Sequence, residues 1–282
     1  MDIRQLQGLG ADLVLPIILV CVAELLLFAG HLKAAVSVHA LVLVLLALLF
    51  AYHGDRSYQA LMLLPLFRLL NIAMPVFFSL TLYSYALIYA PMLVSLAVIL
   101  RYGIFTAQEV GLSLRGLVHY LPLGAALGLL LGWMEYQVIR PEMLTPDSSL
   151  KSLVLLSVVM IIFVGLVEEF VFRSALQTVL EIRWGTPLGL LISSALFAVM
   201  HSGYHMALEL LFVFFAGMTF GLLFLWTRSL PTIAISHGVT NVSLFMIAPL
   251  YDSRGLLALY LAATTAALLL ATMHGGKSRV SI

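Results

Sequence analysis

Apolar stretches long enough to cross a bilayer follow one another along nearly the whole chain. A membrane-spanning helix needs about 20 mostly apolar residues. Ten stretches approach that length, at residues 12–30, 35–52, 61–80, 82–100, 117–136, 150–172, 187–201, 206–226, 230–248 and 254–273. The composition agrees, because 63% of the 282 residues are hydrophobic and 10% are charged, whereas a soluble domain carries about 25% charged residues. We therefore predict an all-α fold, a polytopic transmembrane helical bundle of about nine or ten spans.

The third stretch, residues 61–80, differs from the others in composition. It contains two prolines, an arginine and an asparagine, at Pro65, Pro75, Arg68 and Asn71. These residues favour a kinked, re-entrant or interfacial segment over an ordinary span. The linker at 102–116 mixes polar and apolar residues, which is compatible with an amphipathic helix lying along the membrane surface.

The positive charges in the loops predict an orientation. With ten spans, eight lysines and arginines fall on one side of the membrane and four on the other. Because cytoplasmic loops carry the excess of positive charge, both termini are expected in the cytoplasm of a multi-pass protein of the cell (inner) membrane. Losing one span upstream would move the N-terminus to the other side and leave the C-terminal half unchanged.

The polar connection at 136–150 divides the chain into two regions with different content. We predict N-terminal spans without assigned chemistry at 1–116 and a catalytic core at 117–282. The net charge of +1 and the lack of a basic run exclude nucleic acid as a partner. The lone cysteine, Cys21, is expected to be a buried, inert thiol. Glycines recur every four residues, which indicates close helix packing in lipid; they are Gly124, Gly128 and Gly132, and Gly217 and Gly221.

Two neighbouring carboxylates, Glu168 and Glu169, follow the apolar run 153–167, and Arg173 comes four residues later. A charged side chain in the middle of a membrane costs about 2.5–3.5 kcal/mol, so the pair indicates a functional site. On an α-helix Glu169 and Arg173 are one turn apart and are predicted to pair. Glu168 points about 100° away. A buried carboxylate without its own cation is a stronger base, which suits general-base catalysis. The alternative is a charge cluster in the headgroup region.

Two further polar motifs lie in the spans that follow. Phe197 and His201 are four residues apart at the end of the seventh stretch, and His237 and Asn241 are four apart within the ninth. Residues at this spacing share one helix face. The alternatives are an interfacial histidine for His201 and a hydrogen bond between helices for His237 and Asn241.

The three motifs together resemble the CPBP family of membrane-embedded glutamic proteases. The pattern is E-E-x-x-x-R from Glu168, F-x-x-x-H from Phe197 and H-x-x-x-N from His237, in that order. The family includes the type II CAAX prenyl endopeptidases and bacterial relatives linked to bacteriocin processing and immunity. The resemblance covers residues 168–241 and the spans that carry them.

The resemblance implies a role for each motif residue. Glu168 would be the base that activates water, and His201 would help to hold that water. His237 and Asn241 would stabilise the oxyanion of the tetrahedral intermediate. Glu169 and Arg173 would support the site. Phe197, one turn before His201, would pack against the site or line its cavity. No cofactor is expected.

A zinc-dependent membrane protease is the main alternative chemistry. His201 and His205 have i,i+4 spacing, Glu209 follows one turn later, and Glu168 and His237 could add ligands. The H-E-x-x-H motif of many zinc proteases is not present.

Other protease classes and non-enzymatic functions have less support in the sequence. No G-x-S-x-G motif occurs, and the five aspartates lie at the termini, in loops or at span ends. Intramembrane ionisable residues also mark transporters and proton relays. A non-proteolytic immunity or scaffold protein is a further alternative. We expect an intramembrane endopeptidase acting on a membrane-associated or lipidated protein or peptide; the sequence indicates neither the substrate nor the oligomeric state.

Overall fold

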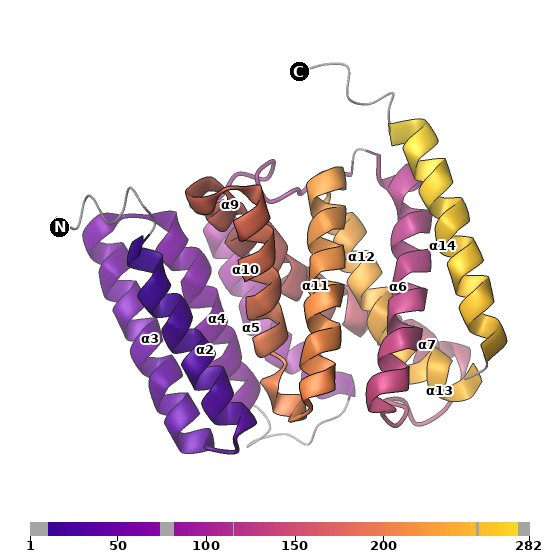
Figure 1. Cartoon of the computed structure of the whole chain (residues 1–282), viewed down its shortest axis with the longest axis horizontal. Coiled ribbons are helices and arrows are strands. Elements are labelled where there is room, and N and C mark those ends of the chain that lie inside the picture. The colour runs from indigo at the N-terminus through magenta and orange to yellow at the C-terminus, as the bar shows by residue number, and fades with distance from the viewer. Residues whose placement is uncertain (1–10, 74–81, 115, 252–253, 276–282) are drawn as a thin grey trace. The chain divides into compact units, whose positions relative to one another are not determined.

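The computed structural model describes residues 11–73, 82–114, 116–251 and 254–275 of the chain (Figure 1). These residues form helices joined by turns, and no strand occurs among them. The helical segments are η1 (Ala11–Leu13), α2 (Val14–Phe28), α3 (Leu32–His53), α4 (Arg56–Ala73), α5 (Leu82–Arg101), α6 (Leu117–Ile139), α7 (Leu150–Val158), η3 (Val159–Gly165), α8 (Leu166–Glu169), η4 (Phe170–Gln177), α9 (Thr178–Trp184), α10 (Thr186–Val199), η5 (Ser202–Tyr204), α11 (Ala207–Thr227), α12 (Leu230–Val242), η6 (Ser243–Ile247), α13 (Ala248–Tyr251) and α14 (Arg254–Gly275). The predicted all-α fold is confirmed.

The chain divides into two compact units. Unit 1 comprises Met1–Ser79, Ile99–Phe105 and Val171–Leu222, and unit 2 comprises Leu80–Val98, Thr106–Phe170 and Leu223–Ile282. Each unit is therefore assembled from segments that lie far apart in the sequence. The functional division at residue 116 remains a prediction.

Unit 1 contains the N-terminal helices and the α9–α10 hairpin. Helix α3 packs against both α2 and α4, while α2 also contacts α10 and η5. Its largest fully buried side chains include Tyr58, Leu64, Phe172, Phe220 and, unusually, the charged Arg173.

Unit 2 is organised around helix α12. This helix packs against α6, α7, η3 and α8, and α14 covers another part of α6. Leu130, Trp133, Ala248 and Tyr260 form an apolar cluster beside these contacts. The central position of α12 matters because it carries His237 and Asn241.

The described residues contain eight helices long and apolar enough to cross a membrane, and α2 is a shorter apolar helix. The protein is thus a multi-pass membrane protein. Of the ten predicted stretches, the third is helix α4, which starts earlier than expected and is not one of the eight. Part of that stretch, residues 74–80, lies outside the described residues. Arg68, one of the polar residues that set this stretch apart in the sequence, is buried within α4.

The sixth predicted span is longer than expected. Instead of ending at residue 172, the helix runs without a break over Leu150–Trp184, 35 residues in all. At 1.5 Å per residue this is about 50 Å, more than the roughly 30 Å of a hydrocarbon core. The predicted end marks the limit of the apolar stretch, whereas the helix continues past the fully buried Arg173. Two π-helical segments, η3 and η4, lie directly before and after the glutamate pair.

The linker at 102–116 does not form the amphipathic helix that its composition suggested. Its described residues form turns, in which the Glu109 carboxylate accepts hydrogen bonds from the backbone and hydroxyl of Thr106, both at 2.9 Å. Two glycines in the left-handed region, Gly103 and Gly111, interrupt any helix there.

The connection before α7 carries a well-formed helix cap. Ser149 is the N-cap residue, and its hydroxyl accepts a hydrogen bond from the Ser152 amide. Hydrogen bonds from Ser149 and Ser152 lower the pKa of the Asp147 carboxyl group from 3.8 to about 2. Because the pKa is lowered, the contribution of this carboxylate is complete above pH 3.8 and is lost as the pH falls through about 2. The start of the helix that carries Glu168 is therefore insensitive to pH near neutrality.

The recurring glycines pack helices closely, as predicted. A Cβ atom added at Gly128 or Gly132 would lie under 3.0 Å from backbone atoms of α12, and one at Gly124 would lie 3.1 Å from the Thr232 carbonyl oxygen. In unit 1, an added Cβ atom would meet side chains instead, that of Phe197 at 3.1 Å from Gly217 and that of Leu190 at 2.3 Å from Gly221. The backbones of α6 and α12 thus approach each other directly, which small residues allow in lipid.

These distances predict a graded effect of alanine along α6. Gly128→Ala and Gly132→Ala are expected to destabilise the protein by about 1–3 kcal/mol each, because the helices must separate. Gly124→Ala is the matched control, since its neighbour needs to move by only a few tenths of an ångström. Thermal unfolding in detergent measures the difference; equal melting temperatures for all three variants would contradict the backbone contact.

Candidate active site

Glu168 lies in α8 in a buried environment within unit 2, 5% exposed. The Tyr89 hydroxyl, from α5, donates a hydrogen bond to Glu168 Oε1. The second oxygen, Oε2, is buried and has no hydrogen-bond partner in the part of the chain that the structure describes. His237 Nε2 lies 3.8 Å from this oxygen. The two atoms are too far apart for a direct hydrogen bond but close enough to share one small polar group.

Glu169 has a different partner from its neighbour. Its Oε1 lies 2.7 Å from Nδ1 of His237, and both residues are almost fully buried. Because a carboxylate only accepts hydrogen bonds, Nδ1 carries the proton, and Nε2 is the ring nitrogen nearer Glu168. A carboxylate that fixes the tautomer of a histidine is a common arrangement in hydrolytic enzymes.

Close packing between η3, α8 and α12 brings the glutamates to His237. An added Cβ at Gly165 would lie 2.5 Å from the Ala234 carbonyl oxygen and 3.0 Å from the Gly238 amide nitrogen. An added Cβ at Gly238 would in turn meet the backbone of Ile161 at under 3.0 Å. The two glycines therefore let the segment before Glu168 approach α12 more closely than side chains would permit.

Tyr89 is a residue of the site that the sequence motifs did not indicate. It lies in α5, outside the C-terminal region that holds the motifs, and is 5% exposed. Its ring stacks at 6.5 Å on that of Tyr85, one turn earlier. Two tyrosines at i,i+4 spacing in an apolar stretch were the available signal, but such pairs also occur in ordinary helix packing.

Arg173 lies in unit 1, fully buried among aromatic rings. Its guanidinium carbon is 4.2 Å from the ring centroid of Phe197, 5.8 Å from that of Phe172 and 5.9 Å from that of Phe220. Cation–π contacts of this kind stabilise a desolvated arginine. The contacts described here for Arg173 and Glu169 are with other groups, and their mutual pairing remains a prediction.

His201 lies just beyond the end of α10, which stops at Val199. Its Nδ1 is 2.8 Å from the Phe197 carbonyl oxygen, so Nδ1 carries the proton and Nε2 is free of this bond. The His201 ring also contacts the Phe197 ring at 4.8 Å and stacks on Tyr204 at 6.3 Å. The role predicted for Phe197, packing against the site or lining its cavity, remains a prediction.

The remaining predicted residues are placed as follows. Asn241 is half-buried in α12, one turn after His237. His205 is exposed, and its Nδ1 is 2.9 Å from the Phe28 carbonyl oxygen. Glu209 is fully buried at the start of α11. Across the described ranges, no three His, Cys, Asp or Glu side chains form a group suited to hold a metal ion.

The structure thus groups the predicted residues into two sets. Glu168, Glu169 and His237 meet in unit 2, together with Tyr89. Arg173, Phe197 and His201 meet in unit 1.

Comparison with known families bears on the segment that contains both sets. Residues 150–243 match the family model described as type II CAAX prenyl endopeptidase Rce1-like. This segment is therefore similar to that family, and we call it the Rce1-like segment. The Rce1-like segment covers a third of the chain and includes all seven residues of the three motifs. The match confirms the predicted resemblance and supports a CAAX-type membrane protease, a hydrolase. No curated protein and no solved structure matches the chain.

Proposed function

We propose that the protein is a glutamic-type intramembrane endopeptidase. It hydrolyses a peptide bond of a membrane-associated or lipidated protein or peptide, with Glu168 activating the attacking water. The observation that carries this proposal is the unequal environment of the two glutamates. Glu169 Oε1 is bound to His237 Nδ1 at 2.7 Å, whereas Glu168 Oε2 lies 3.8 Å from the other ring nitrogen, Nε2, a spacing that one water molecule can bridge.

The proposed reaction needs one base and donors for an oxyanion. Glu168 Oε2 takes a proton from water as the water oxygen bonds to the carbonyl carbon, and the carbonyl electron pair moves onto its oxygen. The electron pair on the oxyanion then re-forms the carbonyl bond as the C–N bond breaks, and the proton on Glu168 passes to the leaving nitrogen. The products are a carboxylic acid and an amine, which become a carboxylate and an ammonium ion by proton transfer, and no acyl-enzyme forms.

The other motif residues have supporting roles in this proposal. Asn241 and His237 stabilise the oxyanion, His237 through the Nε2–H of its doubly protonated ring, whose positive charge is balanced by the Glu169 carboxylate at Nδ1. One such donor is worth about 2.7–4 kcal/mol. His201 helps to hold the water, as the family resemblance implies. Arg173 and Phe197 pack against each other next to His201 and keep its surroundings rigid.

The substrate enters as an extended segment, since a helix hides its carbonyl groups in hydrogen bonds. The excess of positive charge on one side of the membrane predicts that the Glu168–Arg173 segment lies near the cytoplasmic end of its span. The substrate classes that fit are prenylated C-terminal tails and other membrane-bound peptides.

The decisive test of function compares the termini of membrane proteins in cells that produce the wild type or Glu168→Ala. Substrates should show new N- or C-termini with the wild type and full-length ends with the variant. Adding an inhibitor of prenylation to the same comparison separates lipidated from unlipidated substrates. Identical termini in both strains, at equal protein levels, would contradict proteolysis.

Tyr89→Phe is expected to lower kcat about tenfold or more, with little change in KM. A hydrogen bond to a charged group contributes about 1.5–3 kcal/mol, and this one orients the carboxylate that acts as base. Tyr260→Phe is the matched control, because it removes the hydroxyl of another buried tyrosine of unit 2, in the apolar cluster with Trp133. Steady-state kinetics on one purified substrate measures both variants. Equal losses in the two would show that the Tyr89 hydroxyl has no special role.

A further inference from the structure

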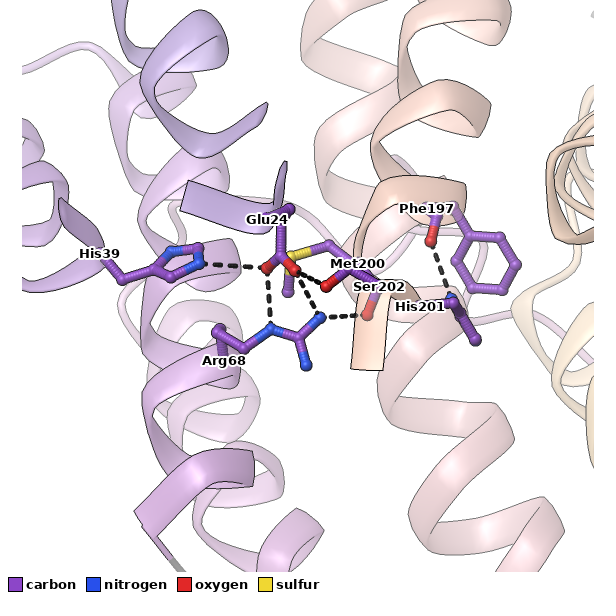
Figure 2. A network of polar contacts seen from close by, with 7 residues as sticks. All are labelled: Glu24, His39, Arg68, Phe197, Met200, His201 and Ser202. Atoms are coloured by element: carbon purple, nitrogen blue, oxygen red, sulfur yellow. Dashed lines mark hydrogen bonds and ion pairs between the residues drawn. The ribbon is translucent and has the colours of Figure 1, made fainter. Parts of the chain in front are cut away.

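Three ionisable side chains from three different N-terminal helices meet inside unit 1. They are Glu24 of α2, His39 of α3 and Arg68 of α4, all buried, with 1%, 0% and 7% of their surface exposed. Arg68 donates two hydrogen bonds to the Glu24 carboxylate, at 2.7 Å and 2.8 Å. His39 Nε2 lies 3.1 Å from Glu24 Oε1. Glu24 is thus the centre of the network, with His39 on one side (Figure 2).

On its other side the network reaches the segment that carries His201. The Ser202 hydroxyl donates to Glu24 Oε2 at 2.5 Å, and Arg68 Nη2 donates to the Met200 carbonyl oxygen. These two residues directly precede and follow His201 (Figure 2). The backbone around His201 is therefore held from both sides by side chains of α2 and α4.

The position of His201 in the chain explains why such support matters. Helix α10 ends at Val199, and His201 lies in the turn between α10 and η5, where its amide donates to the Ala198 carbonyl oxygen at 2.9 Å and its own carbonyl oxygen accepts from the Tyr204 amide at 3.1 Å. The hydrogen bond to the Phe197 carbonyl oxygen orients the ring. It does not fix the turn itself. An active-site group displaced by about 1 Å can lose a hundredfold in rate, so a mobile turn would be costly.

Burying the charged groups of Glu24 and Arg68 costs free energy, which argues against a purely structural role for this network. Charged groups inside a membrane protein require partners, and apolar packing of similar volume is often as stable as a buried ion pair. Here the carboxylate has four polar contacts, and the arginine that neutralises it makes a further bond to the His201 turn. Replacement by apolar residues would pack the helices but would release that turn.

We propose that Glu24 and Arg68 are positioning residues that hold His201 in place for catalysis. This role rests on the proposed function, in which His201 holds the attacking water. It assigns a task to the N-terminal helices, which carry none of the three motifs.

Two variants of the network and one control test this role. Arg68→Lys keeps a positive charge beside Glu24 but cannot make the paired bonds and reach Met200 at once. Ser202→Ala removes the hydroxyl that follows His201 and changes little else. Arg183→Gln is the control, because Arg183 pairs with Asp55 and thereby also links α9 to the N-terminal helices of unit 1, away from His201.

Both network variants should lower kcat about 10- to 100-fold while KM changes less than about twofold. Amide hydrogen exchange at residues 200–205 should become faster in both. Arg183→Gln should leave kcat and that exchange as in the wild type, even where its melting temperature falls. If Arg68→Lys does not fold, the kcat and the amide exchange of Ser202→Ala alone test the positioning role.

The outcomes separate this role from the proposed function. If the wild type cleaves no substrate but amide exchange at residues 200–205 is faster in the two network variants, the proposed protease function is wrong. The structural support of the His201 turn by Glu24 and Arg68 then still holds. Wild-type kcat in Ser202→Ala and Arg68→Lys, or an equal loss in Arg183→Gln, would overturn the positioning role. A fall in kcat with unchanged exchange at 200–205 would overturn it as well.

Discussion

Replacing Glu168 with glutamine is expected to abolish peptide-bond cleavage and to leave the fold intact. Glutamine has the same shape and can still accept the hydrogen bond from Tyr89, but its neutral amide cannot take a proton from water. General-base catalysis contributes about 10²–10⁴-fold, so kcat should fall by at least that factor. Single-turnover kinetics on a purified substrate in detergent or nanodiscs measures the loss.

Glu135→Gln is the matched control for this change. Glu135 is also a buried glutamate of unit 2, 8% exposed, but it lies in α6, outside the Rce1-like segment. Its replacement by glutamine should leave kcat within about twofold of the wild type, since no proton transfer depends on it. Full cleavage by Glu168→Gln would contradict the mechanism. So would wild-type activity that stops on chelation and returns with added zinc, because the water would then be bound to a metal.

Two substitutions of His237 should separate the roles of its two nitrogens. Asparagine places its amide nitrogen near the position of Nδ1, and the longer glutamine places it near Nε2. His237→Asn should therefore keep a donor for Glu169 and lose the group beside Glu168, with a fall in kcat of about 10²–10³. His237→Gln should retain more activity per folded molecule.

Stability should change in the opposite order. His237→Gln removes the donor to the buried Glu169 carboxylate, which costs about 1–3 kcal/mol or more for a charged group. His237→Asn should unfold at a higher temperature than His237→Gln. Melting curves together with kcat on the same preparations test both halves of this expectation. If the same variant were the more stable and the more active, the separate roles of Nδ1 and Nε2 would be wrong.

The sequence predicted most of the architecture, because long apolar helices leave a strong compositional signal. The sequence was a less accurate guide where a charged residue is buried in a helix. The apolar stretch through Glu168 was predicted to end at residue 172, yet the helix continues to Trp184, with the Arg173 guanidinium group packed over the Phe197 ring. The third stretch was singled out for its arginine, and Arg68 indeed sets α4 apart from the ordinary spans.

The pattern of motifs identified the glutamates and histidines, but not the contacts among them. A spacing of four residues predicts that Glu169 pairs with Arg173, which remains a prediction, but no spacing indicated the contact of Glu169 with His237, 68 residues further on. Tyr89 and the Glu24–Arg68 network depend on tertiary packing and carry no local signature. Ionisable residues in three successive apolar helices, Glu24, His39 and Arg68, were the signal that could have revealed the network.

Helix α12 is held at the backbone level by two neighbours, α6 through Gly128 and Gly132 and η3 through Gly165. Because these contacts are between main-chain atoms, no change of side-chain rotamer can absorb a small displacement of the helices. Widening either contact would separate whole helices. If helices move to admit a polypeptide substrate, we therefore expect helices other than α12 to move. Helix α12, which carries His237, should keep its position. Substitutions that alter the rate of substrate entry should accordingly map outside these three segments.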